Sequence, residues 1–126
     1  MLGFFINDHS VPYTLLILQL LKTIETRTRN TLKALIGQRV AIIQTGKGPA
    51  RIVGYVTITK AVFCPADQLD SFRDQTRVPK GSSFDKYGTC EGVPGKWFYY
   101  LDNPEPCAPY PVPADAVRHG RVWVEF

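Results

Sequence analysis

The stretch Lys22-Thr23-Ile24-Glu25-Thr26-Arg27 places a lysine, a glutamate and an arginine within six residues. Its threonines and isoleucine are β-branched, and such residues favour a strand. Because side chains alternate along a strand, we expect Glu25 and Arg27 on one face and Ile24 on the other. A carboxylate and a guanidinium on one face form either a surface ion pair or a clamp for a ligand. The residues around the stretch decide between the two.

The segment before this stretch is strongly apolar. Leucines dominate it, and the sequence predicts a short, mostly buried helix over Tyr13–Leu21. Ser10 is the expected N-cap of this helix, and Pro12 fits its first turn. The chain therefore passes directly from a buried helix into the charged stretch.

A strand in that position is expected to be central, and charges buried there must be paired or bind a ligand. Lys22, Glu25 and Arg27 are thus the best candidate site. A glutamate accepts hydrogen bonds from the edge of a base, and lysine or arginine binds phosphate or carbonyl oxygens. If the protein is an enzyme, Lys22 and Glu25 are the candidate catalytic residues.

The remaining pattern is that of a mainly β (α+β) protein in one domain, residues 1–126. Five to six strands and two or three short helices fit a small closed or nearly closed β-barrel, and their order argues against a doubly wound parallel sheet. Gly54 within a long strand indicates a bulge or a close backbone approach. The expected strands are 3–6, 22–28, 38–45, 51–63, 96–102 and 121–126, with helical turns at 30–36 and 65–74 and loops at 76–95 and 103–113.

Positive charge is concentrated in residues 22–51, which hold seven basic groups and one acidic group. The other 96 residues hold eight basic and ten acidic groups, so this segment carries the excess. Such a concentration attracts anions, including nucleic acid, although a solvated basic face would look the same.

The sequence predicts no metal site, no cofactor and no membrane span. His9 and His119 are too few for a metal site, and no Cys, Asp or Glu completes one at a diagnostic spacing. No apolar run is long enough to cross a bilayer. We expect the three cysteines to be reduced thiols, which predicts a cytoplasmic protein.

Three further residues are candidates for ligand binding. Gly46-Lys47-Gly48 reads as a hairpin turn, but Lys47, flanked by Arg51, could touch phosphate. Trp97 opens a run of four aromatics that ends at Tyr100. Two of the four should enter the core, and a remaining ring could stack on a base.

The charged stretch and its preceding helix resemble the K-T-I-E-x-R signature of ASCH domains. These domains belong to the PUA-like superfamily of small β-barrels. Four later segments resemble the family's later strands in order, namely Lys33–Val40, Arg51–Val56, Lys96–Pro113 and Gly120–Val124. The resemblance covers most of the chain apart from residues 64–95.

The resemblance implies a cleft lined by Lys22, Glu25 and Arg27 that binds RNA, a nucleotide or a nucleoside. Some small superfamily members hydrolyse N4-acetylcytidine with a lysine, a threonine three residues later and a distant glutamate. Here Lys22 matches the lysine, but Glu25 stands where the threonine is expected.

Two alternatives stay open. The first is an amidohydrolase acting on a modified pyrimidine nucleoside such as N4-acetylcytidine. Its acidic partner for Lys22 would be Glu25 or one of the acids Asp67, Asp70, Asp74 and Glu91. The second is a protein-interaction domain, which an exposed trio without a cleft would favour.

Overall fold

The structure, a computed structural model that describes residues 1–126, contains one mixed eight-stranded sheet. The strands run in the order β2-β6-β4-β3-β1-β8-β7, and β5 pairs with β6. Only β1 and β3 pair in parallel. The strands are β1 (Leu2–Asn7), β2 (Ile24–Arg27), β3 (Arg39–Thr45), β4 (Arg51–Pro65), β5 (Gly88–Cys90), β6 (Val93–Pro111), β7 (Val117–His119) and β8 (Trp123–Glu125).

The mainly β fold class is confirmed, and the predicted hairpin of β3 and β4 is present. The sheet is not closed, because β2 and β7 stand at the two ends of the pairing order. The strand count is eight rather than five to six, since the short strands β5 and β7 carry little sequence pattern. No helix is long and apolar enough to cross a membrane.

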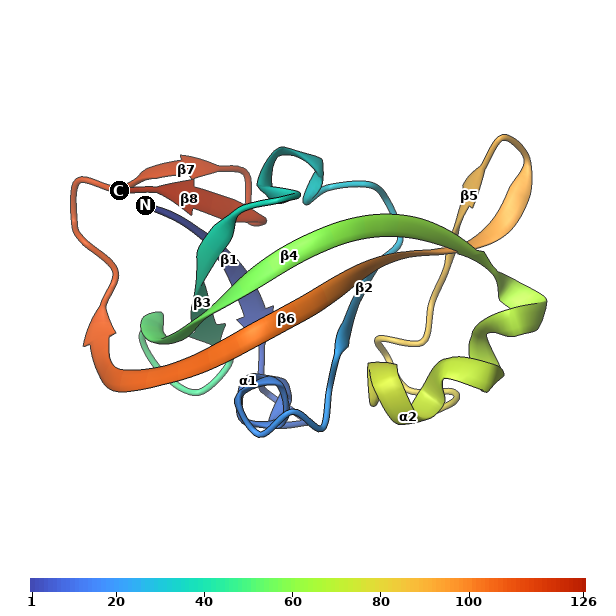
Figure 1. Ribbon diagram of the computed structural model, residues 1–126, viewed down its shortest axis with the longest axis horizontal. Helices are drawn as coiled ribbons and strands as arrows, with labels where there is room; N and C mark the ends of the chain where they lie inside the picture. Colours follow the sequence, from blue (N-terminus) through green and yellow to red (C-terminus); the bar gives the residue numbers. More distant parts are fainter.

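The long strands β4 and β6 cross the whole molecule side by side and set its shape (Figure 1). Their pairing shifts register at three places, one of them between Ile52 and Gly54. A Cβ at Gly54 would lie 2.6 Å from the carbonyl oxygen of Glu105, so the close approach predicted at this glycine is present.

The predicted loop over 103–113 is wrong, because β6 continues through its prolines to Pro111. Beyond Tyr100, where its pairing with β2 ends, the strand pairs with β4 alone. Proline lacks an N–H donor and is tolerated on an edge strand and at bulges. Asn103, with φ of 51°, allows the local bend.

The helix after β1 is shorter and more exposed than expected. It is α1 (Tyr13–Leu18), begins after Pro12, and buries Tyr13, Thr14 and Ile17. The prediction of Ser10 as N-cap is wrong, since the buried carboxylate of Asp8 accepts the Thr14 N–H at 3.0 Å instead.

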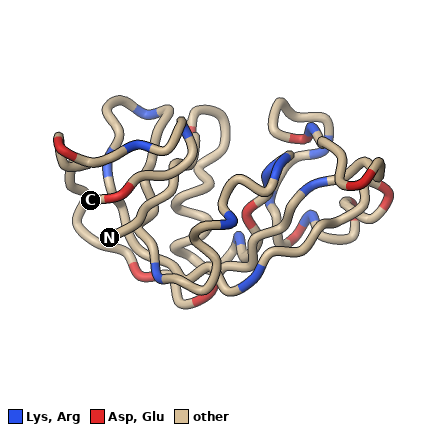
Figure 2. Tube along the Cα trace, turned by 90° about the horizontal axis from the view of Figure 1, so that it is seen from above, with Lys and Arg blue, Asp and Glu red and all other residues tan.

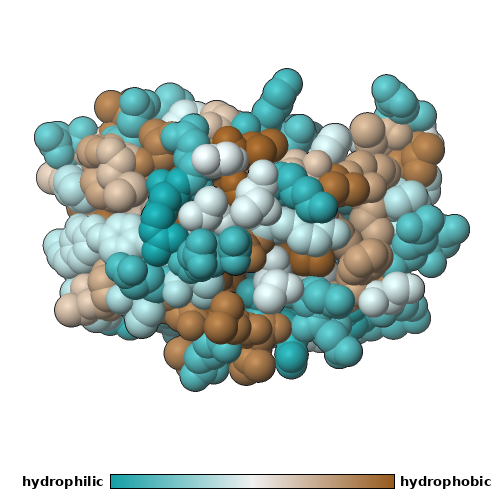
Figure 3. All heavy atoms as spheres, in the orientation of Figure 1, coloured by the Kyte–Doolittle hydropathy of each residue, from teal (hydrophilic) through white to brown (hydrophobic).

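Leu16 and Leu18 of α1 are half-buried against the main core, whereas Leu15 and the leucines of the turn after α1 are exposed, because the helix ends early and the chain turns away from the core. Leu15 is 50% and Leu20 67% exposed. Figure 3, drawn in the orientation of Figure 1, shows an apolar patch at the lower edge of the molecule, over α1.

The other helical turns lie close to their predicted places. They are η1 (Lys33–Leu35), η2 (Ala66–Phe72) and α2 (Arg73–Thr76). The η2 and α2 turns and β5 form one end of the molecule, opposite the end with β7 and β8 (Figure 1).

The four-aromatic run is buried on both of its faces. Tyr99 enters the main core and Phe98 a smaller cluster under η2, whereas Trp97 and Tyr100 are only half-buried. All three cysteines are free thiols, as expected.

Candidate functional site

A cavity of about 710 Å³ lies where β1, α1, β2, the start of β6 and the C-terminal hairpin meet the 77–87 loop. Six of its lining residues are basic and one is acidic, the carboxylate of Glu25. Figure 2 shows several basic positions close together in the central part of the trace. The basic lining residues are Lys22, Arg27, Lys86, Lys96, Arg118 and Arg121.

Lys22 is fully buried, and each N–H group of its ammonium has an oxygen partner. Its Nζ donates to the carbonyl oxygens of Ile24 at 2.9 Å and Thr76 at 2.6 Å. The same atom lies 3.4 Å from Oε1 of Glu25. Lys22 is therefore a fixed charge in the wall of the cavity, with no donor left over.

Glu25 is held between two cations. Its Oε2 accepts from Arg27 at 2.9 Å, and Oε1 faces Lys22 and accepts from the Thr26 N–H at 3.1 Å. Arg27 also donates to the carbonyl oxygen of Phe5 at 2.7 Å, which ties β2 to β1. Oε2 therefore keeps capacity for one more donor.

Burial and pairing act against each other in this trio. Burial lowers the pKa of Lys22 below its usual value, and the Glu25 carboxylate opposes that shift. Burial alone would raise the pKa of Glu25, but Lys22 and Arg27 together hold it below its usual value. Glu25 is thus a carboxylate at neutral pH.

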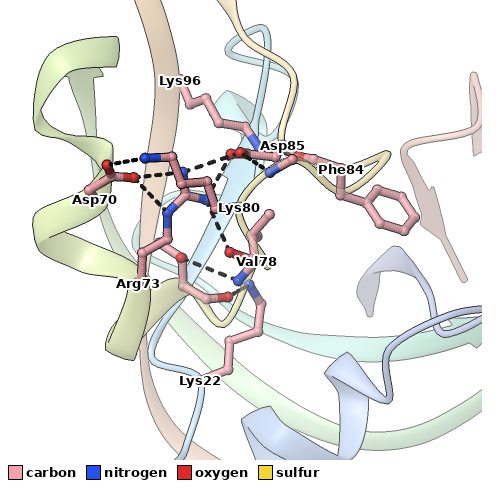
Figure 4. A network of polar contacts seen from close by, with 10 residues as sticks. Lys22, Asp70, Arg73, Val78, Lys80, Phe84, Asp85 and Lys96 are labelled. Atoms are coloured by element: carbon pink, nitrogen blue, oxygen red, sulfur yellow. Dashed lines mark hydrogen bonds and ion pairs between the residues drawn. The ribbon is translucent and has the colours of Figure 1, made fainter.

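The 77–87 loop is fastened over the cavity by a second ion-pair network (Figure 4). Arg73 of α2 contacts Asp85 at 2.7 Å and donates to the carbonyl oxygen of Val78 at 3.0 Å. Asp85 in turn accepts from the Gly81 N–H at 2.7 Å. One arginine and one carboxylate therefore set the shape of the loop.

Lys96 joins this loop to the sheet. Its buried Nζ donates to the carbonyl oxygen of Phe84 at 2.6 Å and has no other protein partner within hydrogen-bond distance. Burial lowers its pKa to about 8, against the attraction of Glu25. A Cβ at Gly95 would collide with the carbonyl oxygen of Cys64, so the preceding glycine lets β6 approach β4 closely here.

Tyr13 lines the cavity, and its hydroxyl has no hydrogen-bond partner. Tyr13 is 5% exposed, and its hydroxyl oxygen is buried with no hydrogen bond. The ring packs edge-on against Phe84 and lies 4.9 Å from Nζ of Lys22. Burial raises its pKa to about 12, so the phenol is neutral and able to donate.

Three cations at the rim differ from those inside. Lys86, Arg118 and Arg121 are exposed, and none has a carboxylate within salt-bridge distance. The guanidinium of Arg118 lies 5.2 Å from the centre of the Phe5 ring. These charges are free to meet an anion.

The predicted trio of Lys22, Glu25 and Arg27 lines one cavity. The other predicted ligand-binding residues, Lys47, Arg51 and Trp97, lie outside it. Their surroundings explain why.

Lys47 is exposed in the β3–β4 turn, and Arg51 donates to Gln44 at 2.8 Å. Trp97 packs edge-on against Phe63 of β4. None of the acids proposed as partners for Lys22 lines the cavity, namely Asp67, Asp70, Asp74 and Glu91. Glu25 is therefore the only one of the proposed partners beside Lys22.

Tyr13, Lys96 and the rim cations were not among the site residues predicted from the sequence. A charged residue at the start of an aromatic strand was a usable signal for Lys96. The sequence carried no such signal for the rim cations, because Lys86 comes from a loop without a pattern and Arg121 from a short hairpin. No group of three or more His, Cys, Asp or Glu residues is arranged to hold a metal ion.

Comparisons with known proteins place this cavity in a known fold. Crystal structures of ASCH from Zymomonas mobilis are similar, with a TM-score of 0.67 and 20% identity over 87% of this chain and 73% of that chain. The chain has the ASCH fold. A Tyr-to-Phe variant of that protein matches with a TM-score of 0.66 at 21% identity over 87% of this chain and 76% of that chain.

A Ser-to-Ala variant matches with a TM-score of 0.66 at 19% identity over 86% of this chain and 73% of that chain. No protein-family model and no curated protein matches the sequence. At these identities the likeness to the ASCH structures concerns the fold, and the function has to be argued from the cavity.

Proposed function

We propose that this protein binds a phosphate-bearing nucleotide in the cavity, either free or as a residue of single-stranded RNA. The observation that carries the proposal is the charge of the lining, six basic side chains against one carboxylate around one cavity of about 710 Å³. That volume lies within the usual range for small-molecule sites.

The division of the lining supports a nucleotide over a simple anion. The rim offers cations without partners, which suit phosphate. The inner part offers the rings of Phe5, Tyr13 and Phe84 together with a few polar groups, which suit a base. A bare phosphate would leave the apolar part of the cavity unused.

Salt dependence tests the proposal. We would measure binding of a labelled mixed-sequence RNA decamer by fluorescence anisotropy and of UMP by calorimetry, between about 50 and 200 mM salt. If the three rim cations each neutralise one phosphate, the logarithm of the decamer's affinity falls with that of salt with a slope of about −2. Replacing Lys86, Arg118 and Arg121 together by alanine should flatten that slope.

The matched control is Lys33→Ala, which removes an exposed charge outside the cavity lining. It should leave both affinity and slope unchanged. Binding of the decamer without UMP would indicate RNA as the ligand, and binding of UMP alone would indicate a free nucleotide. Absence of both, or binding indifferent to salt, would refute the proposal.

A second function, hydrolysis of N4-acetylcytidine, is favoured by one observation. Lys96 is a cavity lysine with a pKa of about 8, so its neutral amine can act as a general base for water. Water would add to the acetyl carbonyl, and acetate and cytidine would leave. Release of cytidine that is lost in Lys96→Met and rises with pH near 8 would establish this activity.

The protein-interaction alternative lacks support. It required an exposed trio with no cleft beside it, whereas Lys22 and Glu25 are buried and line the cavity.

A further inference from the structure

The hydrogen-bonding groups left unused in the cavity define what a ligand must present. Lys22 has no free donor, and Glu25 has capacity for one more donor on Oε2. Arg27 uses only its Nη2 group. Two more deeply buried side chains also have donors to spare, Tyr13 through its unpartnered hydroxyl and Lys96 through the N–H groups not used by Phe84.

The two spare donors belong to one part of the cavity. Phe84 links them, since its ring packs against Tyr13 with centroids 5.8 Å apart and its carbonyl oxygen accepts from Lys96. The Tyr13 ring also lies over Lys22, whose Nζ contacts Glu25. The two donors and the Glu25 carboxylate are therefore linked through neighbouring side chains at the same inner end.

Charge fixes the direction in which a nucleotide enters. Of the inner cations, Lys22 and Arg27 are already paired with Glu25, and Lys96 is buried against the carbonyl oxygen of Phe84. Arg118 and Arg121 at the rim are exposed and have no carboxylate partner. Phosphate therefore stays at the rim, and the base enters the inner end. Buried polar groups at the inner end discriminate between bases, because a base that cannot hydrogen-bond to them leaves them without partners.

Resting on the proposed function, we infer that the inner end selects a base whose edge carries a carbonyl oxygen beside an N–H group. Tyr13 and Lys96 donate to the carbonyl oxygen, and Glu25 accepts from the adjacent N–H. Uracil and guanine present this edge. Cytosine and adenine present an amino group and an unprotonated ring nitrogen, which place donors against donors and an acceptor against the carboxylate.

The pair UMP and CMP tests this inference, because the two ligands share sugar and phosphate and differ at this edge. We expect UMP to bind about tenfold more tightly than CMP, the cost of leaving a buried donor unpaired. GMP should exceed AMP in the same way. Isothermal titration at low salt measures all four affinities.

Tyr13→Phe removes only the hydroxyl and should reduce the UMP to CMP ratio several-fold, to about threefold or less. Tyr100→Phe, outside the cavity, is the matched control and should keep the wild-type ratio. Arg121→Ala should weaken UMP and CMP equally and leave the ratio unchanged, because it acts on phosphate.

The outcomes of these titrations distinguish base selection at the inner end from nucleotide binding itself. If UMP and CMP bind the wild-type protein equally, or CMP binds more tightly, the inference is wrong while nucleotide binding stands. If no nucleotide binds, the proposed function fails. The wild-type ratio decides even if Tyr13→Phe does not fold, and an unchanged ratio in a folded Tyr13→Phe would remove Tyr13 from the selection.

Discussion

The cavity brings together two groups of cations that differ in how they are held. The inner ones, Lys22, Arg27 and Lys96, are buried or partly buried, and each donates to fixed oxygens of the protein. The rim ones, such as Arg118 and Arg121, are exposed and lack carboxylate partners. The same charge thus stabilises the fold inside and remains available to a ligand outside.

The desolvation of charge explains this difference. Inside, each ammonium or guanidinium has lost water and must be compensated by carbonyl oxygens or by Glu25. At the rim, water solvates the charge and a bound anion can replace that water at little cost. Variants that disturb an inner cation should therefore lose far more stability than variants that remove a rim cation, although the change in charge is the same in magnitude.

The largest expected effect is that of Glu25→Gln, which leaves Lys22 buried without its carboxylate. We expect a loss of about 3 kcal/mol or more in the free energy of unfolding, measured by urea denaturation at pH 7. Lys33→Met, at an exposed position, is the control and should change stability little. A loss no larger than that of the control would mean that the pair contributes nothing to the fold.

The pH dependence of the same variant provides a second measurement. The pKa of Glu25 is below its usual value of 4.5 in the folded state, so its contribution is present above that pH and is lost as pH falls through the folded pKa. Wild-type protein should therefore lose stability more steeply than Glu25→Gln below about pH 4.5.

Lys96→Met should show an effect of similar size in a higher pH window, and there too the stability of the wild-type protein relative to the variant should rise with pH. Between pH 8 and 10.5 the unfolded lysine still holds a proton that the folded one has released. Rising pH therefore favours the folded wild-type protein, by about 3 kcal/mol relative to Lys96→Met across this window. Parallel stability curves for the two proteins would show that Lys96 is not desolvated.

Asp85→Asn should have a smaller, local effect, because it weakens the contact with Arg73 that fastens the 77–87 loop. We expect amide hydrogens of this loop to exchange about tenfold faster, while those of β3 and β4 keep their rates. Asp74→Asn, at an exposed position on the same α2, is the control. Equal acceleration in every strand would indicate global destabilisation instead.

Arg121→Ala should have the smallest effect on stability, within about 0.5 kcal/mol of wild type, because the side chain is exposed and unpaired. Thermal unfolding measures this, and the nucleotide titrations described above measure the affinity that it should lose. A large loss of stability would place this arginine with the inner group and remove the distinction between the two.

Much of the fold followed from local pattern. The β-branched runs that became β3 and β4 and the turn at Gly46 were predicted close to their observed bounds. The extent of α1 and the strand character of 103–111 were not. Both depend on what the segment packs or pairs with, since leucines favour burial only where a core is near and prolines fit a strand only at an edge.

The candidate site divides in the same way. Lys22, Glu25 and Arg27 are close in sequence, so their spacing was enough to predict a cluster around Glu25. Lys47 and Arg51 were predicted as ligand-binding residues within the same basic segment, residues 22–51. The β3–β4 hairpin holds them outside the cavity. Charge density along the chain does not specify which side of a sheet a residue occupies.

The sequence by itself determined the β3 and β4 strands and the paired charges of β2, because both arise from residues within a few positions of one another. Only the tertiary structure decided which cations remain free and which hydroxyl remains without a partner. Arg118 meets Phe5 across the molecule, and Tyr13 meets the 77–87 loop through Phe84. Such contacts depend on how distant segments pack, and packing leaves no periodic signal in the sequence.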